Sequence, residues 1–174
     1  MDVKKIMLVA LLGLLSGCDS NLDVFGIKLG GNIEDVKKDG LIKKVDVIPS
    51  DKHLIYAELS SVPSPDAGSE ASYSLQASDG SIVSISANLH DSNGSRYAGI
   101  VSYVKGKLGD AIATESDVIN ETSVNASVYV CSRTKSCPGV KYTVFRKGTN
   151  NALVYYDEKE TNVVFSADAI RDAL

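Results

Sequence analysis

Residues 71–89 constrain the fold more than any other stretch of the chain. Apolar and polar residues alternate on both sides of Asp79-Gly80. Such alternation places every second side chain on a buried face of a half-exposed antiparallel sheet. Asp-Gly is also a favoured pair for the tight turn of a two-stranded hairpin. The pattern therefore predicts a hairpin within an antiparallel sheet that has one buried face.

Further strands are predicted on both sides of this hairpin. Each is a short segment rich in β-branched or aromatic residues and bounded by turn-forming residues. The predicted strands are residues 41–48, 53–59, 123–131, 140–146, 153–156 and 162–165. Turns are expected at 147–151 and 157–160, and the Pro- and Gly-containing stretch 60–69 is expected to be an irregular connection.

Three helices are predicted. The first covers residues 33–38, with Asn32 as its N-cap and Gly40 beyond its end. The second runs from Tyr97 to Gly109, because its apolar residues recur at helical spacing. The third covers 167–174 and begins after Ser166. Together these elements predict an α+β domain, an antiparallel sheet of about six to seven strands with two or three helices on one face.

The N-terminal segment has a different character. Lys4 and Lys5 precede an apolar run over residues 6–15, which is about half the length of a membrane-spanning helix. The run closes with Leu15-Ser16-Gly17-Cys18, which resembles the lipobox of bacterial envelope lipoproteins. The resemblance implies cleavage before Cys18, diacylglycerol on its sulfur and usually a third acyl chain on its amino group. The alternatives are an ordinary secretory signal with a chance cysteine and a buried N-terminal helix.

This resemblance implies a division of the chain and a location. Residues 1–17 would be the signal peptide, 18–24 the lipidated N-terminus and a short tether, and 25–174 a single periplasmic domain. Two or three acyl chains would make attachment to the membrane effectively permanent. Asp19 resembles the signal that retains enteric lipoproteins in the inner membrane, so the inner membrane is favoured and the outer membrane is the alternative.

Charge and composition argue against several partners. The chain has 18 basic and 22 acidic residues, a net charge of −4 and no tryptophan. Nucleic-acid binding and electrostatic membrane binding both need clustered lysine and arginine, which this balance does not favour. The lack of tryptophan argues against carbohydrate-binding platforms built on that residue. Contact with the membrane is therefore expected through the N-terminal lipid.

Cys131 and Cys137 are the two cysteines besides Cys18. In an oxidising periplasm such a pair is expected to form a disulfide, which stabilises a short loop by about 2 kcal/mol. A redox pair more often has two intervening residues, and a zinc site needs more ligands than these cysteines and two scattered histidines provide. Arg133 and Lys135 lie in the loop, which is either a solvated loop or a small basic knob.

No catalytic or metal-binding pattern stands out. His90, Asp91 and Ser92 are adjacent, whereas catalytic triads assemble from distant segments. The acidic turn at 157–160 is shorter than a calcium-binding loop. The glycines form neither a dinucleotide-binding fingerprint nor a phosphate-binding loop. We therefore expect a non-enzymatic protein without a cofactor or metal.

Residues 26–36 resemble the first motif of many small envelope lipoproteins, including the BamE-like components of the outer-membrane assembly machine. The similarity rests on Gly26-Ile27-Lys28-Leu29-Gly30 and Ile33-Glu34-Asp35-Val36. In those proteins the glycine pair turns a strand into a capped helix, and the resemblance implies that Val36 faces the core. The Leu-Gly-x-Pro that follows this helix in the BamE pattern is absent here.

A second short similarity involves residues 93–97 and Lys105-Gly106. Asn93-Gly94-Ser95-Arg96-Tyr97 is similar to a motif of lipoprotein inhibitors of C-type lysozyme, in which a serine and a lysine meet the catalytic carboxylates of the enzyme. The similarity implies Ser95 and Lys105 as the contacting residues. Those inhibitors are all-β barrels.

Taken together, these patterns favour a membrane-anchored lipoprotein of the bacterial cell envelope that acts as a non-enzymatic binding or structural module. Its expected partner is an envelope protein that the sequence does not identify. The alternative is an inhibitor or immunity-type lipoprotein that blocks a lytic enzyme or a toxin.

Overall fold

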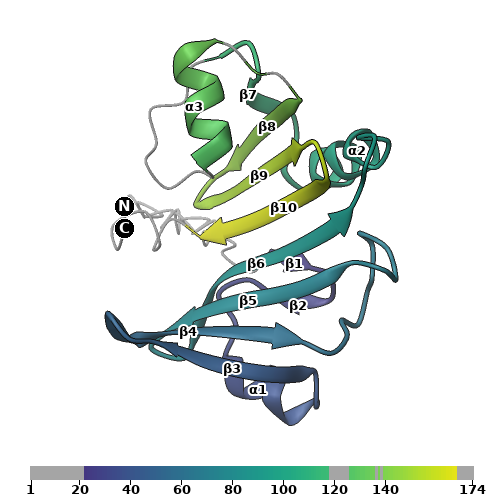
Figure 1. Ribbon diagram of the computed structural model, residues 1–174. Helices are drawn as coiled ribbons and strands as arrows, with labels where there is room; N and C mark the ends of the chain where they lie inside the picture. The colour runs from purple at the N-terminus through teal and green to yellow at the C-terminus, as the bar shows by residue number, and fades with distance from the viewer. Residues whose placement is uncertain (1–21, 118–125, 136, 138, 168–174) are drawn as a thin grey trace, which may run out of the picture.

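A computed structural model describes residues 22–117, 126–135, 137 and 139–167, and these residues contain ten strands and three helices (Figure 1). The strands are β1 Asp23–Val24, β2 Ile27–Lys28, β3 Ile42–Ile48, β4 Asp51–Leu59, β5 Ser72–Ser78, β6 Ser81–His90, β7 Ala111–Thr114, β8 Val140–Lys147, β9 Asn150–Asp157 and β10 Glu160–Ala167. The helices are α1 Ile33–Lys38, α2 Tyr97–Leu108 and α3 Ala126–Thr134. None of these helices is long and apolar enough to cross a membrane.

Eight strands form one antiparallel sheet in the order β3-β4-β5-β6-β10-β9-β8-β7, and β1 and β2 form a separate two-stranded sheet. The large sheet consists of two meanders, β3 to β6 and β7 to β10, which meet where β6 pairs with β10. The α+β class and the antiparallel pairing are confirmed. The number of strands exceeds the predicted six to seven.

The core lies on one face of the large sheet. Residues paired across antiparallel strands share a face, so Leu75, Ile85 and Phe165 form one row across β5, β6 and β10. All three are at most 1% exposed. Helix α1, helix α2 and the β1–β2 hairpin pack against this face, and their apolar side chains belong to the same cluster.

Helix α1 forms where its capping residues predict it. The Asn32 side chain accepts a hydrogen bond of 2.9 Å from the backbone N–H of Glu34, which satisfies a donor at the helix N-terminus. Ile33 and Val36 lie three residues apart and are both buried, so they fasten one side of the helix to the core. Gly40 follows with a φ of +71°, a conformation that glycine adopts without strain.

Helix α2 also has its predicted bounds. The carboxylate of Asp91 accepts hydrogen bonds of 3.0 Å from the backbone N–H groups of Ser95 and Arg96, just before the helix. It also accepts a bond of 2.7 Å from the Thr161 hydroxyl on β10. The helix buries an apolar stripe of Ile100, Val104 and Leu108. Asp91 therefore connects the start of the helix to the centre of the sheet.

The prediction of a strand over 123–131 was wrong for the described part of that segment, because residues 126–131 lie in helix α3. Val128 and Cys131 are three residues apart, so in a helix they lie on the same side. Both are buried against Tyr142 of β8, whereas Val130 is 57% exposed. Packing against the sheet therefore outweighs the strand preference of the β-branched residues.

The structure differs from the prediction in three other ways. Strand β7, at the edge of the large sheet, was not predicted. Ser166 and Ala167 continue β10 and pair with Asn151 and Asn150, so they do not begin a helix, and residues 168–174 lie outside the described residues. The helices also do not share one face of the sheet. Tyr142, which contacts α3, alternates along β8 with Thr143, which is bonded to Tyr97 of α2.

Candidate functional site: a polar groove on the sheet

On the central strands, the face of the sheet opposite the main core carries mainly short uncharged side chains. On β6 these are Ser84, Ser86 and Asn88, which alternate with the buried Ile85 and Ala87. The pairing register extends this set across the neighbouring strands. Its other members are Tyr56 on β4, Ser72, Ser74 and Gln76 on β5, and Asn162 and Val164 on β10.

Part of this face is hollowed into a groove of about 740 Å³, which we call the polar groove. Its lining includes Tyr56, Ser72, Ser74, Ser86, Asn88, Tyr155 and Asn162. Tyr56 is on β4 and Tyr155 is on β9, so the groove extends across five adjacent strands. In contrast to the core face, this part of the sheet presents polar groups in a concave arrangement.

Hydrogen bonds order the floor of the polar groove. The Asn88 amide nitrogen donates to Glu160 at 2.5 Å and to the side-chain oxygen of Asn162 at 2.7 Å. The hydroxyls of Ser74 and Ser86 are bonded to each other at 2.7 Å. These contacts hold the side chains of β5, β6 and β10 in defined positions.

The same contacts leave specific atoms available for a ligand. Both amide hydrogens of Asn88 are used, and its Oδ1 accepts no hydrogen bond from the described residues. The side-chain oxygen of Asn162 accepts from Asn88, whereas its Nδ2 donates to none of the described residues. Asn162 is only 8% exposed. The groove therefore presents one amide acceptor and one amide donor on neighbouring strands.

Charges at the rim of the groove nearly cancel. Lys43 on β3 forms an ion pair of 3.6 Å with Glu58 on β4, and Glu160 is bonded to the neutral Asn88. The groove therefore has no concentration of positive charge for an anionic ligand. Among the described residues, no three His, Cys, Asp or Glu side chains are placed to bind a metal ion.

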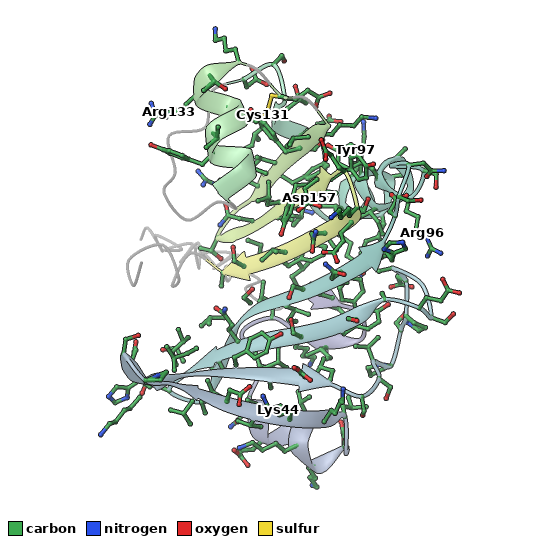
Figure 2. The ribbon with its side chains drawn as sticks, viewed as in Figure 1. Lys44, Arg96, Tyr97, Cys131, Arg133 and Asp157 are labelled. Carbon is green, nitrogen blue, oxygen red and sulfur yellow. A yellow bond between two sulfur atoms is a disulfide. The ribbon has the colours of Figure 1, made fainter. Side chains whose placement is uncertain are left out.

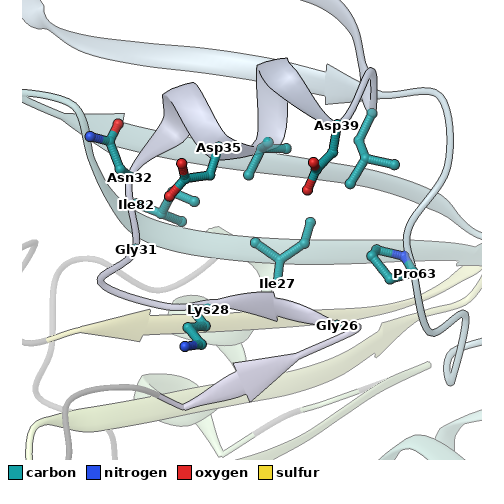
Figure 3. A pocket seen from close by; sticks show the side chains of 11 residues that line it. Gly26, Ile27, Lys28, Gly31, Asn32, Asp35, Asp39, Pro63 and Ile82 are labelled. Atoms are coloured by element: carbon teal, nitrogen blue, oxygen red, sulfur yellow. The ribbon is translucent and has the colours of Figure 1, made fainter.

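A second, smaller hollow of about 270 Å³ lies between α1 and β2 (Figure 3). Asp35 of α1 and Asp39, which follows the helix, point into it, and Lys28 lies on β2. The turn at Gly26 closes one side. Gly26 has a φ of +80°, and a Cβ atom there would lie 2.6 Å from the Cβ of Pro63, so only glycine fits.

The predicted disulfide is confirmed. Cys131 on α3 is bonded to Cys137, with Cα atoms 4.7 Å apart, and Cys131 is 2% exposed. Figure 2 shows Arg133 projecting outward from α3, where its guanidinium lies 5.4 Å from the centre of the Tyr129 ring. Cys18 and Asp19, the predicted lipidation and sorting residues, lie outside the described residues.

Ser95 and Lys105, implied by the similarity to lysozyme inhibitors, do not form one site. Ser95 precedes α2 and its hydroxyl is bonded to Asp91. Lys105 is in the last turn of that helix and forms an ion pair of 2.7 Å with Asp110. Lys105 lies eight residues, or about 12 Å, along the helix from Tyr97, and Ser95 lies before that start, so the two side chains are well separated.

Asp91 has a structural role in this arrangement. Burial acts to raise its pKa, but hydrogen bonds from Thr161, Arg96 and Ser95 stabilise the charged form and hold the pKa below its usual range. His90 is exposed at the end of β6, while the Asp91 carboxylate is turned toward the backbone before α2. The two side chains therefore do not cooperate in a catalytic arrangement.

The polar groove was not predicted, although its residues lie in strands that were. Alternating polar residues usually mark a solvated face, and charged residues are common on such faces. Here the alternate positions of β5 and β6 are serine, glutamine and asparagine. This run of short uncharged residues was the available signal.

No family model matches the chain, and no curated protein matches it significantly. Among solved structures, the chain is similar to a cysteine-rich secretory protein from Staphylococcus aureus subsp. aureus Mu50, at 16% identity and a TM-score of 0.39. The match covers 82% of this chain and 45% of that protein, so the chain spans less than half the length of that protein.

Proposed function

We propose that this protein is a lipid-anchored, non-enzymatic binding module of the bacterial cell envelope, and that the polar groove is its binding surface. The observation that carries the proposal is the difference between the two faces of the sheet. One face is filled by α1, α2 and the β1–β2 hairpin, whereas the other, beside the part that α3 covers, presents ordered amides and hydroxyls in a hollow. Concave sites with a few positioned polar groups are typical of ligand binding.

The N-terminal sequence supports the location. Cys18 closes a lipobox-like segment, and its acylation would attach the domain to a membrane by two or three chains. Asp19 favours the inner membrane over the outer one. The disulfide between Cys131 and Cys137 is consistent with an oxidising compartment such as the periplasm.

Site-specific photocrosslinking in native envelopes tests the groove. A photoreactive phenylalanine analogue at Ser72, an exposed residue of the groove, should give a defined adduct that excess unlabelled wild-type protein suppresses. The same analogue at Ser102, which is exposed on α2, is the matched control and should give none. Equal labelling at both positions, or no competition by wild-type protein, would contradict the proposal.

Lipidation and sorting are tested separately. Palmitate labelling should be lost in Cys18→Ala, and label that persists would rule out acylation at that residue. Asp19→Ser should move the protein from the inner-membrane to the outer-membrane fractions of a sucrose gradient. Wild-type protein already in the outer-membrane fractions would refute the proposed sorting role.

A further inference from the structure

We propose that the polar groove binds a neutral oligosaccharide of N-acetylated sugars. This inference rests on the proposed function, in which the groove is the binding surface, and it adds the chemical class of the ligand. Three features of the groove support the proposal. Its two amides each keep one atom without a partner among the described residues, its basic residue Lys43 is paired with Glu58, and hydroxyls line it between two tyrosines.

The amide groups of Asn88 and Asn162 match an acetamido group. An acetamido group has one N–H donor and one C=O acceptor. The Oδ1 of Asn88 and the Nδ2 of Asn162 have no partner among the described residues. The former can accept from that N–H, and the latter can donate to that C=O. Asn162 is only 8% exposed. A hydrogen bond to its amide from a ligand therefore contributes more binding free energy than the same bond at a solvated position.

The electrostatics favour a neutral ligand. Lys43 is paired with Glu58, and the nearby Glu160 adds a negative charge that is bonded to Asn88. A phosphorylated or sulfated chain would meet no cluster of basic side chains here, although such clusters are how proteins bind these groups. A sugar chain carrying only hydroxyl and acetamido groups avoids this mismatch.

The dimensions of the groove suit a short chain of sugars lying across the strands. Adjacent strands are about 4.7–4.9 Å apart, so the four spacings from β4 to β9 span roughly 19 Å. Each spacing is close to the length of one pyranose ring. Ser74 and Ser86 provide hydroxyls in the middle of this path, and Tyr56 and Tyr155 provide rings near its two ends.

A peptide also has amide groups, but the groove suits it less well. Bound peptides gain much of their affinity from pockets for alternate side chains. The lining of this groove instead alternates hydroxyl and amide side chains with small or partly covered apolar residues such as Ala71, Ala87 and Val164. A ligand with hydroxyls along its whole length satisfies these groups better than one with apolar side chains.

The test measures fluorescence anisotropy with the full-length lipidated protein in detergent. The probes are labelled tetra-N-acetylchitotetraose and labelled cellotetraose, which has hydroxyls in place of acetamido groups. We expect the N-acetylated probe to bind about tenfold or more tightly than cellotetraose, because a site built for hydrogen bonds rejects an analogue that lacks them. Equal affinity for the two probes, or no binding of the N-acetylated one, would overturn the inference.

Variants locate the binding within the groove. Asn162→Leu removes the amide at similar size and should reduce affinity for the N-acetylated probe to that for cellotetraose. Ser72→Arg, at an exposed groove position, should block both probes without disturbing the core. Asn93→Leu, in the exposed loop before α2, is the matched control and should bind like wild type. Wild-type binding by both groove variants would place the sugar elsewhere and refute the inference.

The outcomes separate this inference from the proposed function. If the probes fail to bind while competed crosslinking from Ser72 persists, the groove remains a binding surface and only the ligand class is wrong. Displacement of the N-acetylated probe by tetra-alanine at lower concentration than by unlabelled sugar would identify a peptide site and also overturn the sugar assignment. Loss of both crosslinking and probe binding would overturn both.

Discussion

The described residues form two hydrophobic clusters of very different size. The larger one draws buried side chains from α1, α2, the β1–β2 hairpin and both meanders of the large sheet. The smaller one lies on the opposite face, where Val128 and Cys131 of α3 meet Tyr142 of β8. Tyr142 also donates a hydrogen bond to the backbone oxygen of Asp117.

The difference shows how a peripheral helix is held where little apolar area is available. Each fully buried aliphatic side chain contributes about 1.5–3 kcal/mol, and the ordering of each residue costs about 1–2 kcal/mol. Three buried side chains therefore offset the ordering of only a few residues. The disulfide between Cys131 and Cys137 closes the end of α3 covalently and makes up part of this deficit.

The largest loss of stability is expected from a substitution in the larger cluster. Phe165 is fully buried, and its ring centre lies 6.0 Å from that of Phe25 and 6.2 Å from that of Tyr103. Phe165→Ala should lower the free energy of unfolding by about 3–5 kcal/mol, because it removes contacts and leaves a cavity. Urea denaturation measures this loss. A change below about 1 kcal/mol would mean that the larger cluster does not dominate stability.

Substitution of Asp91 should give the next largest loss of stability, and the size of this loss depends on pH. Asp91→Asn should cost about 2–3 kcal/mol at neutral pH, because hydrogen bonds to a buried charge are lost. The pKa of Asp91 is lowered in the folded protein, so its stabilising contribution is complete above the unfolded value of about 3.9 and disappears as pH falls through the folded pKa.

Urea denaturation across this pH range should show the wild type converging on Asp91→Asn in acid. The exposed Asp35→Asn is the matched control. A difference between wild type and Asp91→Asn that stays constant down to low pH would exclude the proposed role of the charge.

Loss of the disulfide should affect the smaller cluster alone. Cys131→Ser with Cys137→Ser should lower stability by about 2 kcal/mol. Hydrogen exchange should speed up in α3, while the amides of β5 and β6 keep their protection. Val47→Ser, at a residue of β3 that is 56% exposed, serves as a surface control. Equal acceleration in β5 and β6 would show that the two clusters unfold as one unit.

The smallest loss of stability is expected from a substitution at the N-cap of α1, a short helix that packs on the larger cluster. Asn32→Ala removes the side-chain acceptor for the Glu34 N–H and should cost about 1 kcal/mol. Asn32→Ser keeps an acceptor and should retain most of the stability. Thermal denaturation followed by circular dichroism measures both. An Ala variant as stable as the Ser variant would show that burial of Ile33 and Val36, not the cap, holds the helix.

Elements with strong local signals were predictable. Asn32 and Gly40 mark the bounds of α1, the spacing of Ile100, Val104 and Leu108 marks α2, and alternation marks the strands of the larger cluster. Helix α3 was not predictable, because its β-branched residues favour a strand and only contact with Tyr142 decides between the two structures. Strand β7 has four residues, and Ile112 within it is 55% exposed, so it carries little pattern.

The polar groove could not be predicted from the sequence for a different reason. Asn88 and Asn162 are 74 positions apart, and nothing local indicates that β6 pairs with β10. The sequence predicts that each side chain lies on the polar side of its strand. The pairing of the two strands alone brings the amides together.

The seam between β6 and β10 has a consequence for how the molecule reaches its native state. Within each meander, paired strands follow one another along the chain, whereas the seam joins residues as far apart as Asn88 and Asn162, 74 positions, and closes the longest loop in the sheet. We therefore expect the two meanders to form first and the seam to form late. Because Asn88 and Asn162 lie on opposite sides of the seam, a half-folded chain would have no complete polar groove. The proposed ligand binding would therefore be restricted to molecules that have finished folding.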